Sequence, residues 1–163
     1  MNINIGILTM SDKGSRGERV DLSGPAIREM VSKIGKVVRY EIIPDDQPVI
    51  AEKLIEWADS GEVDVILTNG GTGLSARDVT PDATLSVIDK SVPGITEAMR
   101  AKSLTITPTA MLSRAVAGLR GETLIINLPG SPKAVKECLE VALPAIPHAV
   151  EIIKGTFTEH QIK

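Results

Sequence analysis

The first half of the chain alternates compact apolar runs with segments whose apolar residues recur at helical spacing. Residues 3–10 form one such run, which is typical of a strand buried on both faces. A helix that ends near Gly35 is predicted next, from apolar residues at i, i+3, i+4 and i+7: Ile27, Met30, Val31 and Ile34.

The same alternation continues through residue 67. Residues 37–43 and 63–67 are predicted as strands, and a second helix ends before Gly61. Its inward face carries four residues: Ile50, Leu54, Trp57 and Ala58. This order of strands and helices implies right-handed crossovers and a largely parallel sheet with helices on both faces. Ligands of such sheets bind beyond the carboxyl ends of the strands.

The second half of the chain has a less regular pattern. Pro93 is suited to open a helix, whose inward residues we expect to be Ile95, Ala98 and Met99. Residues 115–119 and 123–128 are predicted as a hairpin. A last helix follows, broken by Pro144 and Pro147, with an apolar face made of Val135, Cys138, Leu139 and Ala142. Without an internal repeat or linker, we predict a single α/β domain over residues 1–163.

Composition narrows the function classes. The 163 residues include 42% hydrophobic and 24% charged residues, and the net charge is −3, which is ordinary for a globular protein. Neither a basic face nor a set of stacking rings is available for nucleic acid, because the only aromatics are Tyr40, Trp57 and Phe157. The chain has neither a signal-peptide pattern nor an apolar run long enough for a membrane helix, so we expect a cytoplasmic protein with no membrane contact.

Cysteine and histidine offer little chemistry. Cys138 is the only cysteine, which excludes an internal disulfide, and we expect it to lie in the core. His148 stands in an apolar stretch and is expected to be packed, whereas His160 falls in the polar tail.

The strongest local motif is the glycine cluster Gly70–Gly73 with the residues after it. Glycines let the backbone approach an anion closely, and successive N–H groups in such a loop can bind one. A tight turn that binds nothing is the alternative interpretation. We favour anion binding because the cluster follows a buried strand and precedes Arg77, Asp78 and Asp82.

Two standard phosphate motifs fit this cluster poorly. Because no Gly-Lys-Ser/Thr follows, it is not a P-loop. Residues 71–76 do match the dinucleotide pattern G-x-G-x-x-G/A, but that motif needs a helix to begin inside it. Thr80 and Pro81 interrupt such a helix within its first turns, so we expect no nicotinamide cofactor.

Polar side chains follow the other predicted strands. Asp45 and Asp46 come after the second strand, and clustered carboxylates near bound phosphates are what Mg²⁺ requires. Helix capping is the alternative, favoured for Asp46 and equally weighted for Asp45. Residues 127–133 end a strand and open a helix, with Ser131 a natural N-cap, and residues 11–14 complete a ring of loops at one edge.

Taken together, these motifs resemble the molybdopterin adenylyltransferase family. The matching stretches run through nearly the whole chain in the family's order: residues 7–12, 43–46, 68–84, 93–94, 99–100, 113–115 and 128–133. The resemblance implies a three-layer fold around a mixed, mainly parallel sheet, assembled as a homotrimer. It also implies Mg²⁺-dependent transfer of AMP from ATP to the terminal phosphate of molybdopterin, with release of pyrophosphate.

The resemblance also implies roles for single residues. Asp45 and Asp78 would be the catalytic carboxylates and tentative Mg²⁺ ligands. Substrate binding would fall to Ser11, Asp12, Thr68, Asn69, Gly70, Gly71, Thr72, Gly73, Thr80, Asp82, Ser113, Arg114, Pro129, Gly130, Ser131 and Lys133.

Two other functions stay open at this stage. A binding module that carries molybdopterin without adenylating it is the main alternative. A related fold in nucleotide-sugar pyrophosphatase-like proteins associated with competence damage makes hydrolysis of a dinucleotide a further one. A separate partner protein that inserts molybdate is also compatible with the expected product.

Overall fold

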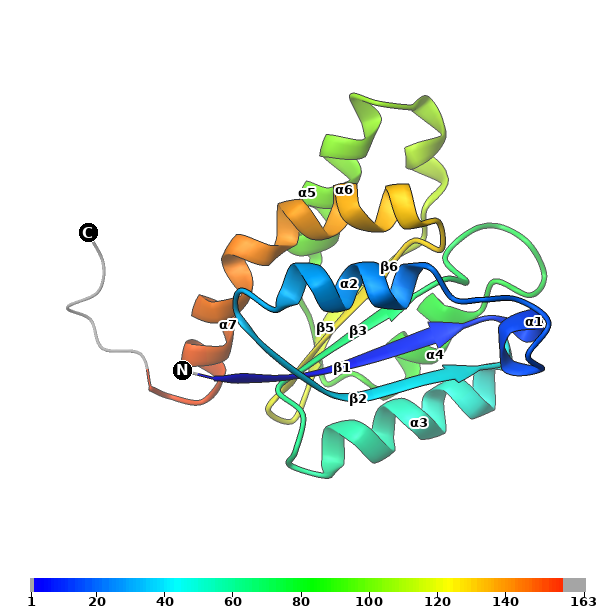
Figure 1. Cartoon of the computed structure of the whole chain (residues 1–163). Helices are drawn as coiled ribbons and strands as arrows, with labels where there is room; N and C mark the ends of the chain where they lie inside the picture. The colour runs from blue at the N-terminus through cyan, green and yellow to red at the C-terminus, as the bar shows by residue number, and fades with distance from the viewer. Residues whose placement is uncertain (1, 157–163) are drawn as a thin grey trace.

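The computed structural model describes residues 2–156, which form one six-stranded sheet in the order β2-β1-β3-β6-β5-β4 (Figure 1). The strands are β1 (Ile3–Met10), β2 (Gly35–Ile43), β3 (Val65–Asn69), β4 (Lys90–Ser91), β5 (Ala117–Arg120) and β6 (Thr123–Leu128). The first four in spatial order are parallel, whereas β5 and β4 are antiparallel to their neighbours. The predicted α/β fold with a mixed, mainly parallel sheet is confirmed.

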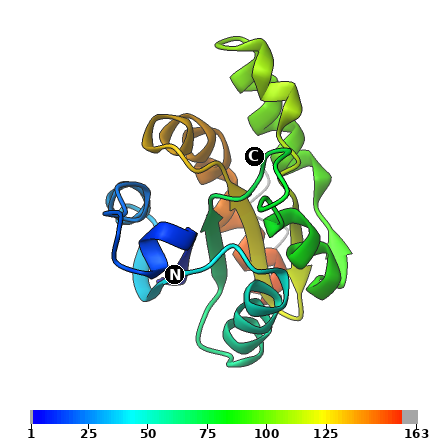
Figure 2. The ribbon, with the colours of Figure 1, turned by 90° about the vertical axis from the view of Figure 1, so that its right-hand side faces the viewer.

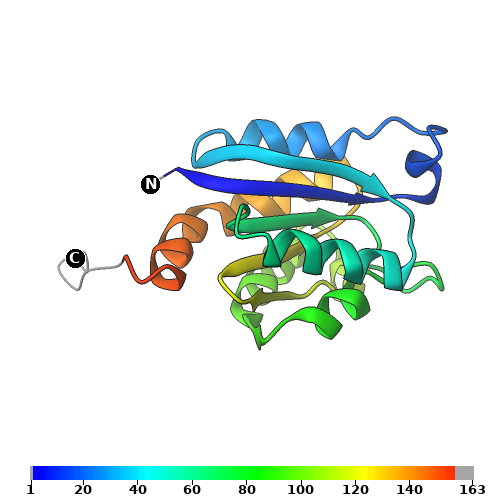
Figure 3. The same ribbon diagram turned by 90° about the horizontal axis from the view of Figure 1, so that it is seen from below.

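Helices cover both faces of this sheet. One face packs against α2 (Ser23–Val31), α5 (Pro93–Leu104), α6 (Pro132–Ala142) and α7 (Ile146–Ile153). The other packs against α3 (Gln47–Asp59) and α4 (Thr80–Val87), which lie in front of the sheet in Figure 3. The remaining elements are the short helix α1 (Asp12–Ser15) and the 3-10 helices η1 (Pro108–Leu112) and η2 (Leu143–Ala145).

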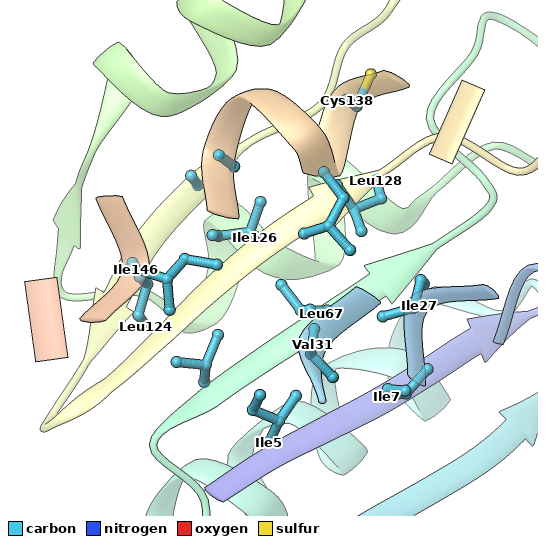
Figure 4. Packing of buried hydrophobic residues seen from close by; sticks show 14 of the residues in the cluster. Ile5, Ile7, Ile27, Val31, Leu67, Leu124, Ile126, Leu128, Cys138 and Ile146 are labelled. Atoms are coloured by element: carbon cyan, nitrogen blue, oxygen red, sulfur yellow. The ribbon is translucent and has the colours of Figure 1, made fainter. Parts of the chain in front are cut away.

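Side-chain alternation along the central strands divides the core in two. In β1, Ile5 and Ile7 pack with α2 and α6, whereas Leu8 packs with α3. Figure 4 shows the first of these clusters, in which Ile27 of α2 and Ile126 of β6 lie over the same sheet face. Burial on both faces explains why these strands are continuous apolar runs in the sequence.

Several predicted elements are confirmed with small shifts of their ends. The hairpin of β5 and β6 forms as expected, and the chain splits at Pro144 into η2 and α7. Strand β3 begins at Val65, two residues later than predicted. Gly61 has a φ of 75°, as expected for the residue after a helix end.

Three expectations were wrong, and one helix was not predicted. Helix α2 ends at Val31, and Gly35 instead begins β2, where a Cβ would stand 2.1 Å from the Ile3 carbonyl oxygen. On α5, Met99 is buried and Ile95 packs against the core, as expected. Ala98 is exposed, and Thr96 is buried in its place, because side chains three residues apart face the sheet.

The third error concerns His148. His148 lies on the solvent side of α7, with its side chain 57% exposed and its Nδ1 3.6 Å from Glu151. As expected, no helix begins within residues 71–76, but the helix that follows, α4, was not predicted. It begins at Thr80, and Pro81 occupies its first turn, where proline is well tolerated. His160 lies outside the described residues. Among residues 2–156, no helix has the length and apolar character needed to cross a membrane.

Candidate functional site

The loops that follow the parallel strands meet at one edge of the sheet, which faces the viewer in Figure 2. Residues 11–14 follow β1, Asp45 follows β2, the glycine loop Gly70–Gly73 follows β3, and residues 129–131 follow β6. The parallel pairing of these strands brings all four loops together. The predicted ring of loops is therefore confirmed.

Backbone geometry explains the glycines of this loop. Gly70 and Gly71 have φ values of 94° and 69°, a region that favours glycine. A Cβ at Gly70 would stand 2.6 Å from the Met10 carbonyl oxygen, and one at Gly71 would stand 2.4 Å from Thr80 Oγ1. Within the described part of the chain, the N–H groups of residues 71–73 donate to no protein acceptor. The loop thus presents three consecutive donors, as an anion site requires.

Two pockets adjoin the glycine loop. The first measures about 590 Å³ and is lined by Gly70 and Gly71. The second measures about 440 Å³ and is lined by Thr72 and Gly73. The loop therefore forms part of the wall of both pockets.

Several carboxylates line the first pocket, among them Asp12, Asp45 and Asp78. Asp12 and Asp45 hold each other in place. The Asp12 N–H donates to Asp45 Oδ2, and the Asp45 N–H donates to Asp12 Oδ1, each over 3.0 Å. Asp78 Oδ2 accepts from the Ser75 N–H at 2.9 Å. Asp45 therefore serves the pocket, and Asp46 alone caps α3, with Oδ1 3.2 Å from the Val49 nitrogen.

Asp12 is paired with a cationic side chain, whereas the pKa of Asp45 is raised by its surroundings. Arg77 pairs with both oxygens of Asp12, at 3.0 and 2.8 Å, and this bonding lowers the pKa of Asp12. Burial raises the pKa of Asp45, and the charges of Asp12 and Asp78 also act to raise it. A ligand that brings positive charge to Asp45 would reverse this effect.

Apolar side chains also line the first pocket. Val20 and Leu22 are among them and are largely exposed to solvent. Beside them, Asp21 accepts hydrogen bonds from Thr9 Oγ1 at 2.8 Å, from the Tyr40 hydroxyl and from two N–H groups at the start of α2. The first pocket thus combines exposed apolar side chains with several carboxylates.

The second pocket lies between the glycine loop, α5, η1 and α6. Its lining is largely apolar but includes five hydroxyl residues of α5, η1 and the loop after them: Thr96, Ser103, Thr107, Thr109 and Ser113. Glu137 and Arg100 add one charge of each sign. Cys138 is buried as predicted, with Sγ 3.6 Å from Ser103 Oγ, and burial raises the pKa of its thiol. Figure 4 shows Cys138 on α6, at the edge of the cluster drawn there.

Most of the predicted site residues line one of the two pockets. The first pocket includes Ser11, Asp12, Asp45, Asn69, Gly70, Gly71, Asp78, Gly130 and Ser131. The second includes Thr72, Gly73, Ser113 and Pro129. Ser131 also caps α6, with Oγ 3.2 Å from the Ala134 nitrogen.

Five predicted residues line neither pocket. Thr68 is fully buried and accepts from Asn127 Nδ2 at 3.0 Å, and Thr80 Oγ1 is buried without a partner among the described residues. Asp82 and Arg114 form an ion pair at 3.0 Å beneath the glycine loop. Lys133 has a side chain 81% exposed, with Nζ 4.0 Å from Glu137.

Several residues of the site escaped prediction from the sequence. Arg77 stands beside Asp78 in the chain, and only the folded structure shows that it reaches Asp12, sixty-five residues earlier. The hydroxyl residues of α5 and η1 have no distinguishing spacing, so no local signal marks them. Arg77 could have been selected from its place in the motif, whereas Ser103 and Thr109 could not.

The carboxylates of the first pocket are its only negatively charged candidate metal ligands among the described residues. No group of three or more His, Cys, Asp and Glu side chains within residues 2–156 is arranged to hold an ion. Asp45 and Asp78 nevertheless line the same pocket, and their charges interact. Two carboxylates fit Mg²⁺, which commonly completes its shell with water and substrate phosphates.

The fold and the site define a class: an α/β protein with two pockets, joined by a glycine loop, at the carboxyl edge of its parallel strands. Residues 6–148 match the model of the family described as "Probable molybdopterin binding domain". The chain belongs to this family, and the resemblance drawn from its motifs is confirmed.

Relatives of this chain cover nearly its full length. A molybdopterin adenylyltransferase of Helicobacter pylori (strain J99) is 46% identical over 160 residues, which is 96% of this chain and 91% of the relative. The crystal structure of the molybdopterin biosynthesis enzyme MoaB of Thermus thermophilus is 53% identical, with a TM-score of 0.89 and coverage of 94% and 97%. The tungsten cofactor synthesizing protein MoaB of Pyrococcus furiosus is 39% identical, with a TM-score of 0.86 and coverage of 94% and 98%.

Proposed function

We propose that this protein is a molybdopterin adenylyltransferase that uses Mg²⁺ and ATP. Membership of the family and the names of its curated relatives support the reaction class. The observation that carries the proposal is the pair of pockets that share the glycine loop, with Asp45 and Asp78 beside it. A reaction that joins two phosphorylated substrates needs two binding spaces that meet where the phosphates react.

The proposed reaction is a displacement at the α-phosphorus of ATP. An oxygen of the terminal phosphate of molybdopterin attacks the α-phosphorus of ATP and forms a new P–O bond. The bond between the α-phosphorus and the bridging oxygen to the β-phosphorus breaks, and pyrophosphate leaves. Positioning and electrostatic stabilisation supply most of the catalysis in such transfers.

We assign ATP to the first pocket and molybdopterin to the second. The first offers carboxylates for a phosphate-bound metal, the N-terminus of α6 for an anion, and the apolar side chains of Val20 and Leu22 for a base. The second offers several hydroxyls and the Glu137 carboxylate, acceptors suited to the amino and N–H groups of a pterin.

The glycine loop would hold the reacting phosphates between these pockets. Its amides at residues 71–73 donate to none of the described residues and could stabilise phosphate oxygens. Asp45 and Asp78 would hold Mg²⁺, which when bound neutralises phosphate charge and polarises the α-phosphate. Arg77 would compensate the charge of Asp12 beside them.

Adenylyl transfer can be measured directly. The purified protein is incubated anaerobically with molybdopterin, ATP and Mg²⁺, and adenylylated pterin and pyrophosphate are quantified. We expect product from the wild type and a loss of roughly 10²-fold or more in Asp45→Asn and Asp78→Asn, because each removes a charge that acts on the transition state. Asp46→Asn is the matched control, since asparagine caps α3 as well as aspartate does and activity should stay unchanged.

The outcome separates the enzyme from a carrier. Wild-type protein that binds molybdopterin without forming product or pyrophosphate would establish the carrier function instead. Full activity in both Asp45→Asn and Asp78→Asn would contradict the assigned site even if product forms.

Two further expectations accompany this function. A homotrimer is supported by apolar side chains exposed on the projecting α5–η1 segment, which rises beyond α6 in Figure 1: Leu104, Ile106, Met111 and Leu112. Light scattering of the purified protein tests this state. A cytoplasmic location and a separate molybdate-inserting partner remain predictions of the family resemblance.

A further inference from the structure

The segment that carries Asp78 has little structure of its own. Residues 73–79, here called the Asp78 loop, contain no helix or strand. Within the loop, Ser75 and Asp78 exchange two hydrogen bonds, from the Asp78 N–H to the Ser75 carbonyl at 3.0 Å and from the Ser75 N–H to Asp78 Oδ2 at 2.9 Å. These local bonds shape the turn, and the exposed side chain of Arg77 links it to Asp12. A second attachment holds the backbone of the turn where Asp78 lines the first pocket.

Arg114 supplies that attachment from a distant part of the sequence. Its backbone N–H donates to the Thr72 carbonyl at 2.9 Å, and its Nε donates to the Gly73 carbonyl at 3.0 Å. Its Nη2 donates to the Asp78 carbonyl at 2.6 Å. These bonds hold the loop at both ends, at Thr72 and Gly73 on one side and at Asp78 on the other.

Asp82 fixes the guanidinium group itself. Nη1 and Nη2 of Arg114 bind the two Asp82 oxygens at 3.1 and 3.0 Å. This bonding to Arg114 lowers the pKa of Asp82. Four of the five guanidinium N–H groups are thereby committed to residues 73–82. Arg114 therefore has little capacity left to bind a substrate directly.

A second arginine extends the connection into the other pocket. Nη1 of Arg100, on α5, donates to the carbonyls of Ser113 and Ala115 at 3.4 and 3.0 Å. These two residues flank Arg114, and Arg100, Ser113 and Ala115 all line the second pocket. Contacts thus run without a break from the wall of the second pocket, through Arg114, to Asp78 in the first.

We propose that Arg114, fixed by Asp82, is a positioning residue that sets Asp78 in the first pocket and joins its placement to the wall of the second. This inference rests on the proposed adenylyl transfer for its catalytic consequence. Lysine cannot replace arginine here, because a single ammonium cannot bind a carboxylate through two parallel bonds while reaching two carbonyls.

Arg114→Lys tests the proposal while keeping the charge. We expect kcat for adenylyl transfer to fall roughly 10- to 100-fold, because small displacements of a catalytic group are that costly. Hydrogen exchange should accelerate in the peptide that spans residues 71–80. Asp82→Asn should show both effects in weaker form, since it retains part of the bonding to Arg114.

Arg120→Lys is the matched control. Arg120 binds both oxygens of Asp59 at 3.0 Å and donates to the Val87 carbonyl at 2.9 Å, and it lines neither pocket. The same chemical change there should leave kcat and exchange of the Asp78 loop unaltered. Equal losses of kcat in the two variants would overturn the proposal, because the effect would then be one of general stability.

A double variant tests whether the effect of Arg114 on kcat depends on Asp78. If Arg114 acts through Asp78, Arg114→Lys/Asp78→Asn should be no slower than Asp78→Asn alone. Independent, multiplicative losses would overturn the assignment. If the wild type forms no adenylylated pterin, the proposed function fails, and the exchange measurement still decides whether Arg114 holds the loop.

Discussion

At the scale of single residues, the placement of Asp45 in the proposed site lowers the stability of the ligand-free protein. Its carboxylate is partly buried beside Asp12 and Asp78, and burial raises its pKa. The charged form is therefore disfavoured in the ligand-free fold, as is common where side chains are placed for function.

Asp45→Asn should accordingly stabilise the ligand-free protein. Asparagine can still accept the hydrogen bond from the Asp12 N–H, and it removes the disfavoured charge. We expect a rise in Tm of about 1–3 °C at pH 8. Because the pKa of Asp45 is raised, the wild type gains relative stability as the pH falls through that pKa, and the difference should disappear in acid. Calorimetry across pH checks this, and a lower Tm for the variant at pH 8 would contradict it.

Alanine substitutions at Gly71 and Gly61 allow the cost of backbone strain to be compared with the cost of a steric clash. The two glycines have φ values of 69° and 75°, so alanine at either position suffers a similar conformational penalty of about 1–2 kcal/mol. Only at Gly71 would the added Cβ meet another atom, Thr80 Oγ1 at 2.4 Å, whereas nothing lies within 4 Å at Gly61. Gly71→Ala should therefore lose more unfolding free energy than Gly61→Ala in urea titrations. Equal losses would mean that Thr80 moves aside without cost.

At the scale of elements, helix α6 serves both the fold and the first pocket. Ser131 caps it and lines that pocket, so a loss of function on removing the hydroxyl would have two explanations. The carboxyl ends of parallel strands and the N-termini of the following helices coincide in this fold, which is why caps and ligands share the same residues.

Ser131→Asp distinguishes the two roles. Aspartate is a good N-cap, so the unfolding free energy should stay within about 0.5 kcal/mol of the wild type, whereas Ser131→Ala should lose about 1 kcal/mol. The added negative charge faces the proposed nucleotide pocket and should weaken Mg²⁺–ATP binding roughly tenfold, measured by calorimetric titration. Unchanged affinity in Ser131→Asp would place the phosphates elsewhere.

For the whole molecule, Asp64 joins the last helix to the central strands. Its Oδ1 lies 2.7 Å from Lys154 Nζ, and its Oδ2 accepts from the Asn4 N–H at 2.8 Å. The Asp64 side chain is only 10% exposed, so removal of its cation leaves a poorly solvated charge. This pair lies at the opposite end of the strands from the pockets, where β1 begins.

Lys154→Met should therefore lower stability without changing the site. We expect a loss of about 1–2 kcal/mol in unfolding free energy, with catalytic constants unaltered at about 25 °C. Arg16→Met breaks an ion pair that is exposed on both sides, with Glu18, and should have little effect on stability. If Lys154→Met has the same unfolding free energy as the wild type in chemical denaturation, water solvates Asp64 adequately and the prediction is wrong.

The spacing of apolar residues along the sequence was sufficient to predict most of the helices and strands. Strands buried on both faces leave continuous apolar runs, and helices on a sheet leave apolar residues at i, i+3 and i+4, so β1, α3 and α6 follow from local pattern alone. Helix α4 did not follow, because Pro81 indicates a break as readily as a first turn.

The sequence by itself also determined which chemistry stands at the carboxyl edge, since the glycine loop, Asp45, Asp78 and Ser131 all follow predicted strands. Only the tertiary structure decided what each residue contacts. Arg114 was expected to bind substrate, yet it bonds to residues 72–82, and Arg77 reaches Asp12, which follows a different strand. Such pairings depend on which strands are neighbours in the sheet, and long-range order of that kind leaves no trace in the spacing of residues along the chain.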